Sequence, residues 1–227
     1  MGVGKTVQAI CIMYLFKEDW PLMILCPSSL KFTWREEILK WLPEMRPEHI
    51  QLFKQGKDKF NDNAKVYIMS YDLAARRFEE ISARNFKASI ADESHYLKNR
   101  DAKRSKNLIP ILMNSKRCIL ISGTPILSRP VELYNILRIL RPDIFHNFND
   151  YANRYCDPSP GKFGVDYNGK SCTSELHFLL SRNLMIRRLK ADVLSELPDK
   201  RRQKIQIPVD PKMQKEIMSL LNDTDEG

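Results

Sequence analysis

Short, continuous apolar runs that alternate with helical patterns limit the fold of this chain more than any other feature of its sequence. The clearest run, Leu22–Cys26, reads LMILC and lies between two prolines. A run that is apolar at every position suits a strand buried on both faces, as in a parallel sheet. Four further strands are predicted at residues 50–53, 66–69, 88–91 and 117–122. Because strands and helices alternate, we predict an α/β fold with a parallel sheet and helices on both faces.

Helical patterns lie between these strands. Residues 7–16 place apolar side chains three and four positions apart, which predicts a helix directly after the opening residues. Ser28 or Ser29 is positioned to cap a second helix that runs to about Trp41. We also expect the strand at 88–91, which reads ASIA, to pack loosely because its side chains are small.

The second half of the chain follows a different pattern. From Arg129 onward the sequence favours helices joined by irregular linkers, and residues 157–174 are rich in turn formers. A last short strand is predicted at residues 204–207, followed by a polar helix from about Pro211. This half therefore reads as a helical appendage to the α/β part.

Composition excludes several classes of protein. A hydrophobic content of 43% with 29% charged residues is ordinary for a globular protein. The longest apolar runs are far shorter than the roughly 18 to 20 residues of a membrane span, and the opening lacks a cleavable signal pattern, so we expect a protein inside the cell with no membrane partner. The five cysteines are odd in number and form no C-x-x-C pair, which favours unpaired thiols over disulfides or a zinc site.

The chain is basic. Lysine and arginine exceed aspartate and glutamate by enough to give a formal net charge of +9. Such a charge favours a polyanionic partner such as nucleic acid, because binding releases counterions and the attraction is long-ranged. A basic surface that only keeps the protein soluble is the alternative.

The opening residues, MGVGKT, match the second half of the phosphate-binding loop G-x-x-x-x-G-K-[ST]. In such a loop the glycines let backbone N–H groups approach phosphates, the lysine reaches the β and γ phosphates, and the hydroxyl binds Mg²⁺. The match involves Gly2, Gly4, Lys5 and Thr6. A string this short can also arise by chance.

A second motif, IADESH, follows the strand predicted at 88–91. In a nucleotide-hydrolysing site one acid holds Mg²⁺ and another orients or deprotonates the attacking water, and both project from the carboxyl end of a strand. Asp92 and Glu93 suit these two roles. Alone, such a pair can equally be a solvated turn, and His95 a surface histidine.

A third motif, ISGTPI, follows the strand predicted at 117–122. Ser122 and Thr124 carry hydroxyls that could hydrogen-bond the acidic motif and transmit the state of the phosphates. A tight turn is the alternative. Three such motifs in this order, each at a strand-to-helix junction, support one another.

Together the segments MGVGKT, CPSSLKFTW, SYD, DESH, SGTP and MIRRLKADVLSELPDK resemble the amino-terminal ATPase lobe of Swi/Snf-related DNA translocases in helicase superfamily two. DESHYLKN, SRPVELYNILRILRP and NRYCD look closest to the HepA-related annealing helicases, which rewind DNA and remodel stalled replication forks. The resemblance implies a RecA-like lobe over residues 1–128, whose first strand is not in the sequence. A helical extension and linker over 129–200 and the start of a connection to a second lobe over 201–227 would follow.

The resemblance also implies ATP and Mg²⁺ as ligands and assigns roles to the motif residues. Lys5 would contact the β and γ phosphates, and Gly2 and Gly4 would allow close backbone approach. Thr6 and Asp92 would hold Mg²⁺. Glu93 would be the base that activates water, and three residues would couple this motif to the following strand: His95, Ser122 and Thr124.

Double-stranded or forked DNA is the partner that the resemblance implies, together with replication or repair proteins and a nuclear location. Ser28 and Ser29 match the segment that tracks one DNA strand through phosphate contacts. Trp34 belongs to the same segment, although a tryptophan on this helix face is more often a core residue. Lys98 and Arg100 could contact phosphates, or could form a solvated helix face.

Parts of the family pattern are not in the sequence, including the strand before the phosphate loop and the second lobe with its arginine fingers. Such a finger contributes roughly 10³ to 10⁵ in rate, so we expect this chain to be a fragment that hydrolyses little ATP alone. A non-catalytic module that binds DNA or a partner protein is the alternative function. A small-molecule P-loop kinase is less favoured, because the carboxyl half shows MIRRLKADVLSELPDK instead of a lid and substrate site.

Overall fold

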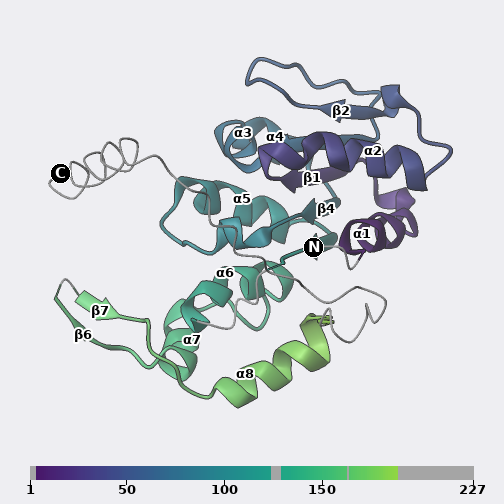
Figure 1. Ribbon diagram of the computed structural model, residues 1–227. Helices are drawn as coiled ribbons and strands as arrows, with labels where there is room; N and C mark the ends of the chain where they lie inside the picture. Colours follow the sequence, from purple (N-terminus) through teal and green to yellow (C-terminus); the bar gives the residue numbers. More distant parts are fainter. Residues whose placement is uncertain (1–3, 124–128, 163, 189–227) are drawn as a thin grey trace, which may run out of the picture. The chain divides into compact units, whose positions relative to one another are not determined.

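The computed structural model describes residues 4–123, 129–162 and 164–188 (Figure 1). These residues contain a five-stranded sheet and a two-stranded hairpin. The strands of the sheet are β1 (Leu22–Cys26), β2 (Ile50–Leu52), β3 (Val66–Ser70), β4 (Ala88–Ala91) and β5 (Arg117–Leu120). Each coincides with a predicted strand to within two residues at either end.

The five strands are parallel and lie in the order β2-β3-β1-β4-β5. Strand β1 is central, with Leu25 opposite Met69 of β3 on one side and Ala91 of β4 on the other. The chain first builds the sheet to one side of β1, through β2 and β3, and then to the other side, through β4 and β5. The predicted parallel α/β fold is confirmed.

Eight α-helices and several shorter helices precede, connect or follow these strands within the described residues. The α-helices are α1 (Lys5–Tyr14), α2 (Lys31–Trp41), α3 (Tyr71–Arg76), α4 (Phe78–Arg84), α5 (Lys103–Met113), α6 (Pro130–Leu140), α7 (Phe148–Tyr155) and α8 (Thr173–Leu179). The shorter ones are η1 (Lys17–Asp19), η2 (Ser28–Leu30), η3 (Pro47–His49), η4 (Ser94–Leu97) and η6 (Leu180–Leu184).

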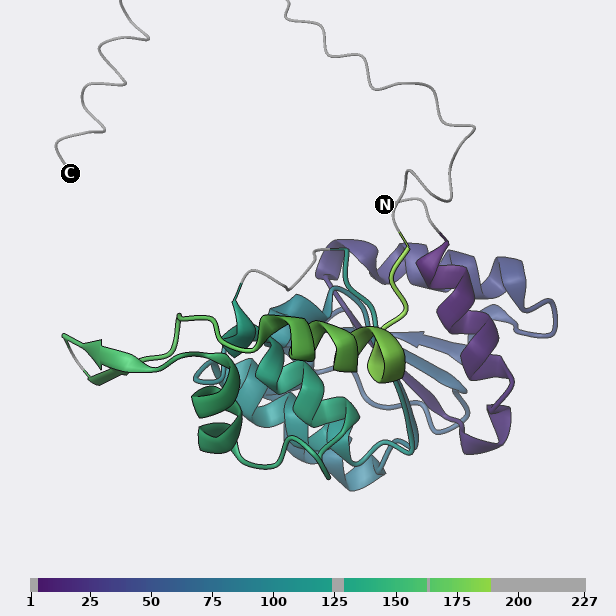
Figure 2. The same cartoon turned by 90° about the horizontal axis from the view of Figure 1, so that it is seen from below.

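Helices cover both faces of the sheet, as Figure 2 shows. Side chains of alternate residues along β1 point to opposite faces. Leu22 and Ile24 pack in a core with α1 and α2, whereas Met23 and Leu25 pack in a second core with α3, α4 and α5. Because β1 is buried at every position, the continuous apolar run in its sequence is explained by helices on both faces.

One local prediction was wrong, and a second stays a prediction. Neither Ser28 nor Ser29 caps α2, because the 3₁₀ helix η2 intervenes and Leu30 is the N-cap, without a side-chain hydrogen bond. Every residue of the ASIA strand β4 is buried. Strands β1 and β5 pair with its two edges, and the loose packing expected from its small side chains remains a prediction.

The second half of the described chain builds a third apolar core from α6, α7 and α8, with side chains such as Leu137, Tyr151 and Leu176. Helix α6 also contributes Ile136 and Ile139 to the core formed by α3, α4 and α5. Within the stretch predicted to be turn-rich, an exposed antiparallel hairpin forms from β6 (Ser159–Gly161) and β7 (Gly164–Asp166), visible in Figure 1. The boundary after residue 128 remains a prediction.

The strand predicted at residues 204–207 and the helix after it lie outside the described residues. Within the described ranges, no helix has the length and apolar character needed to cross a bilayer. All five cysteines are unpaired.

Candidate functional site

The predicted motif residues gather along one edge of the sheet. Asp92 directly follows β4, Ser122 lies two residues beyond β5, and Ser28 follows β1 by two residues. Because the strands are parallel, their carboxyl ends share an edge, and the sheet order reverses beside β1. A crevice at such a reversal is where open α/β sheets bind ligands.

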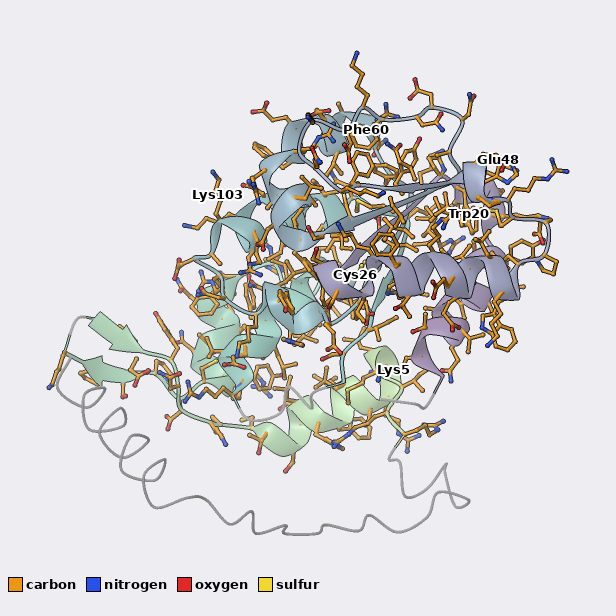
Figure 3. All side chains as sticks on the ribbon, turned by 45° about the horizontal axis from the view of Figure 1, so that its top comes forward. Lys5, Trp20, Cys26, Glu48, Phe60 and Lys103 are labelled. Atoms are coloured by element: carbon orange, nitrogen blue, oxygen red, sulfur yellow. The ribbon has the colours of Figure 1, made fainter. Side chains whose placement is uncertain are left out.

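Lys5, Glu93 and Gly123 converge at this edge. A Cβ atom placed on Gly123 would lie 3.5 Å from Glu93 Oε1 and 3.9 Å from Lys5 Nζ. Lys5 is the first residue of α1, where Figure 3 labels it, and Gly4 before it has a φ of 73°. This left-handed conformation is one that glycine adopts readily. The start of a helix presents unpaired N–H groups to an anion, so the amino end of α1 suits a phosphate.

The other residues of the loop are less fully described. Thr6 follows Lys5 in the first turn of α1 and is partly exposed. Gly2 lies outside the described residues.

Asp92 is buried, its backbone N donates to the carbonyl of Leu25 at 2.8 Å, and its three oxygen atoms accept hydrogen bonds. Its Oδ2 accepts from Trp34 Nε1 at 2.9 Å, its Oδ1 accepts from the backbone N of Glu93 at 2.9 Å, and its carbonyl oxygen accepts from the Tyr71 hydroxyl at 2.7 Å. Burial raises the pKa of Asp92, while the bonds from Trp34 and Glu93 act in the opposite direction. The carboxylate is therefore oriented by the indole of Trp34 and the next backbone N–H, while Tyr71 holds the backbone of the same residue.

Glu93 reaches the same space by a sharp backbone turn. Its φ and ψ are 50° and 49°, a left-handed conformation that is unusual for a residue with a side chain and that clusters at functional sites. Its Oε2 lies 3.1 Å from Nδ1 of His95 and accepts from the backbone N of Gly123 at 3.4 Å. The backbone N of Ser94 donates to the carbonyl of Ile121, which fixes the acidic turn to the end of β5.

The predicted coupling residues are placed only in part. His95 contacts Glu93 and is half-buried, and Ser122 is half-buried beyond β5. Thr124 lies outside the described residues. The coupling role of the three residues remains a prediction.

A hollow of about 480 Å³ lies over the carboxyl ends of β1 and β3, at the same edge of the sheet as the acidic motif. Cys26, which Figure 3 labels, ends β1 and lines it, and burial together with the charge of Asp92 raises the pKa of this thiol to about 12. Ser28 lines the hollow and Ser29 is exposed next to it. The other lining residues include five with polar or charged ends and two tyrosines: Lys31, Lys54, Gln55, Asp72, Arg76, Tyr71 and Tyr96.

Lysine and arginine side chains give this hollow a basic character. Lys54 and Arg76 are exposed, while the buried Lys31 donates from Nζ to the carbonyl of Phe53 at 2.8 Å. Exposed cations beside serine hydroxyls can contact phosphate oxygens without reading a base sequence.

Lys98 and Arg100 have contacts elsewhere. Lys98 Nζ lies 3.2 Å from Glu132 Oε1 of α6, and the guanidinium of Arg100 lies 3.3 Å from the ring centre of Phe148 in α7. Both side chains therefore link the segment after the acidic motif to the helical part. Their contact with DNA remains a prediction.

Sequence patterns gave no sign that Trp34 and Tyr71 reach Asp92. From the sequence, Trp34 was interpreted as either a core residue or a DNA-tracking residue. In the structure it is buried, and its indole N–H donates to the carboxylate of Asp92. Tyr71 stacks on Tyr96, with ring centres 5.3 Å apart and planes 7° apart. A contact that joins residues 58 positions apart follows only from the folded chain.

The oxygen atoms of Thr6 and Asp92 suit Mg²⁺, which prefers oxygen ligands and is usually bound by one or two carboxylates together with phosphate oxygens and waters. Elsewhere in the described ranges, no cluster of three or more histidine, cysteine, aspartate or glutamate side chains could hold a metal. The donor set therefore fits a cation that arrives with a nucleotide.

The parallel sheet, the helix start at Lys5 and the acidic pair at the carboxyl edge define a RecA-like nucleotide-binding lobe. The chain belongs to the family of SNF2-related domains, whose profile matches residues 1–223. The family predicted from the sequence motifs is thereby confirmed.

Individual relatives agree with this membership. The chain is 45% identical over 205 residues to "SWI/SNF-related matrix-associated actin-dependent regulator of chromatin subfamily A-like protein 1" of Xenopus laevis, a match that covers 90% of this chain and 21% of that protein. It is 46% identical over 214 residues to the Homo sapiens "DNA annealing helicase and endonuclease ZRANB3", covering 90% and 20%. The chain thus spans about a fifth of the length of these curated relatives.

A solved structure shares the fold. The "Sulfolobus solfataricus SWI2/SNF2 ATPase core in complex with dsDNA" superimposes with a TM-score of 0.69 at 24% identity, covering 100% of this chain and 48% of that one. At this level of identity the likeness concerns the fold.

Proposed function

We propose that this lobe binds ATP with Mg²⁺ and, within a longer two-lobe protein, takes part in DNA-dependent ATP hydrolysis that drives movement along double-stranded or forked DNA. Membership of the SNF2-related family and similarity to a protein named as a DNA annealing helicase support this proposal. The proposal includes work in DNA repair or fork remodelling in the nucleus, beside replication or repair proteins, and a relative named as a regulator of chromatin is consistent with a nuclear location. The observation that carries the proposal is the convergence of Lys5, Glu93 and Gly123 next to Asp92.

The roles proposed for Lys5, Glu93 and Asp92 are consistent with their geometry. Lys5 would hold the β and γ phosphates at the start of α1, and Glu93 would orient and deprotonate the attacking water. Asp92 and Thr6 would hold Mg²⁺, which neutralises charge on the phosphate oxygens when bound. His95 lies within 3.1 Å of the Glu93 carboxylate and would keep it in position, while Ser122 and Thr124 would couple the site to β5.

Duplex DNA would lie against the hollow beside Ser28. Motion along any sequence requires contacts with phosphates and none with base edges, and the serines and exposed cations of this surface meet that requirement. Lys98 and Arg100 would add phosphate contacts only if DNA displaced their present partners on α6 and α7.

Two variants test the assignment. Lys5→Ala should weaken ATP binding because it removes the cation that faces the phosphates. Glu93→Gln should bind ATP like the wild type, because it removes the base and leaves the phosphate contacts in place. Binding is measured with a fluorescent ATP analogue on this chain, and turnover by phosphate release from a longer protein that contains both lobes, where both variants should be inactive.

Lys17→Ala is the matched control, since this exposed lysine lies in η1 beyond the far end of α1. If Glu93→Gln lost ATP binding while Lys5→Ala kept it, the two roles would be reversed. A wild-type chain that binds duplex DNA but no ATP would favour the alternative of a non-catalytic DNA-binding module.

A further inference from the structure

Asp92 is held from both faces of the sheet by side chains that lie outside the acidic motif. Trp34 belongs to the core between the sheet and helices α1 and α2, whereas Tyr71 belongs to the core on the opposite face. Trp34 Nε1 donates to the carboxylate at 2.9 Å, and the Tyr71 hydroxyl donates to the backbone carbonyl of the same residue at 2.7 Å. Both donors are buried.

We propose that Trp34 and Tyr71 are positioning residues for Asp92, and that the indole N–H of Trp34 sets the orientation in which the carboxylate holds Mg²⁺. This inference rests on the proposed function of the site. Partners that hydrogen-bond to a metal ligand fix its orientation, and their loss typically lowers metal affinity 10- to 100-fold.

The hydrogen-bond pattern leaves the carboxylate able to bind a metal. An ionised carboxylate has about four acceptor positions. Trp34 occupies one position on Oδ2 and the backbone N of Glu93 occupies one on Oδ1, so each oxygen keeps a further lone pair.

Packing alone does not require these donors. A phenylalanine ring would fill most of the space of either side chain without placing a polar group against Asp92. Two buried donors from opposite faces of the sheet nevertheless meet at one residue. We explain this arrangement by the need to fix the position of Asp92 relative to the helices on both faces.

Trp34→Phe and Tyr71→Phe each remove the donor and keep an aromatic ring. Binding of a fluorescent ATP analogue to this chain is titrated at increasing Mg²⁺ concentration and, separately, in excess chelator. We expect Trp34→Phe to weaken Mg²⁺ binding in the nucleotide complex about tenfold or more and Tyr71→Phe to weaken it less, with nucleotide affinity in chelator unchanged. A purely structural role would lower both affinities or neither.

The chain offers close controls. Trp41 lies on the same helix as Trp34 and donates to Glu37 Oε2 at 2.8 Å, and the Tyr67 hydroxyl donates to the carbonyl of Asn61 at 2.7 Å. Trp41→Phe and Tyr67→Phe therefore make the same substitutions and each remove one side-chain hydrogen bond away from Asp92, so they should leave the Mg²⁺ dependence unchanged.

Wild-type Mg²⁺ affinity in a folded Trp34→Phe chain would overturn the inference, as would an equal loss in Trp41→Phe. If Trp34→Phe did not fold, as judged by circular dichroism, Tyr71→Phe would decide, and an unchanged Mg²⁺ affinity there would count against the proposal. A wild-type chain without Mg²⁺-dependent ATP binding would instead overturn the proposed function of the site.

Discussion

The salt dependence of DNA binding should depend on two exposed cations of the hollow, Lys54 and Arg76. Lys31 is excluded from this count because its ammonium is buried against the carbonyl of Phe53. Each phosphate neutralised contributes about 0.9 to the slope of log affinity against log salt, so Lys54→Ala/Arg76→Ala should reduce the slope by about 1.8. Between about 50 and 200 mM salt the wild type should then lose about tenfold more affinity than the variant.

The assay is a titration of a fluorescently labelled duplex at several salt concentrations, repeated with duplexes of unrelated sequence. The control is Lys17→Ala/Lys40→Ala, which removes the same charge from exposed positions near the opposite, amino ends of the strands. If both double variants reduced the slope equally, the net charge of +9, and not the hollow, would govern binding. Sequence-selective binding would also refute the reasoning.

Two further predictions concern the scaffold. Asp19 pairs with Lys116 Nζ at 2.9 Å and with Arg117 Nε at 3.3 Å, and the hydrogen bond from Lys116 is the main cause of the lowered pKa of Asp19. The pairing therefore stabilises the folded chain above the usual aspartate pKa of about 4, and this stabilisation is lost as the pH falls through the lowered pKa. Thermal unfolding should show Asp19→Asn less stable than the wild type at neutral pH and equal to it in strong acid, with Glu18→Gln showing no such difference. Cysteine reactivity is measured by alkylation at mildly alkaline pH followed by mass spectrometry. The exposed Cys11 and Cys172 should react in the folded chain, whereas Cys26, which is buried and has a pKa of about 12, should react only after unfolding. Labelling of Cys26 in the folded chain would contradict its burial.

The strands could be predicted from the sequence because burial on both faces leaves a local pattern. LMILC is apolar at each position, and every one of these residues is buried. The pattern of β4 is less informative: its small residues suggested loose packing, and all four are buried. How tightly a strand packs depends on the distance of its neighbours, which for Ala88 and Ala91 include β1 and β5. That information is not contained in the four residues themselves.

Capping was mispredicted for a related reason. Ser28 and Ser29 have the side chains of N-cap residues, but a cap requires one backbone conformation at one position. Here the chain first forms η2 after Pro27, and the helix begins at Lys31. The serine hydroxyls are thus left exposed beside the hollow, where they can serve a ligand and not the helix.

Trp34 shows what a motif leaves undetermined about a site. The sequence offered two readings of this residue, a core side chain or a part of the DNA-tracking segment. The structure supports the first and adds a contact that neither reading contains, since the ring is buried and its N–H is bonded to Asp92. Helix α2 directly follows η2, which carries Ser28 and Ser29, the residues proposed to contact DNA. Through the hydrogen bond from Trp34, the same helix also contacts Asp92, the residue proposed to hold Mg²⁺. If both proposals hold, the position of α2 affects the binding of both DNA and Mg²⁺. Trp34→Phe should then weaken the binding of Mg²⁺ without removing a group that touches either DNA or Mg²⁺.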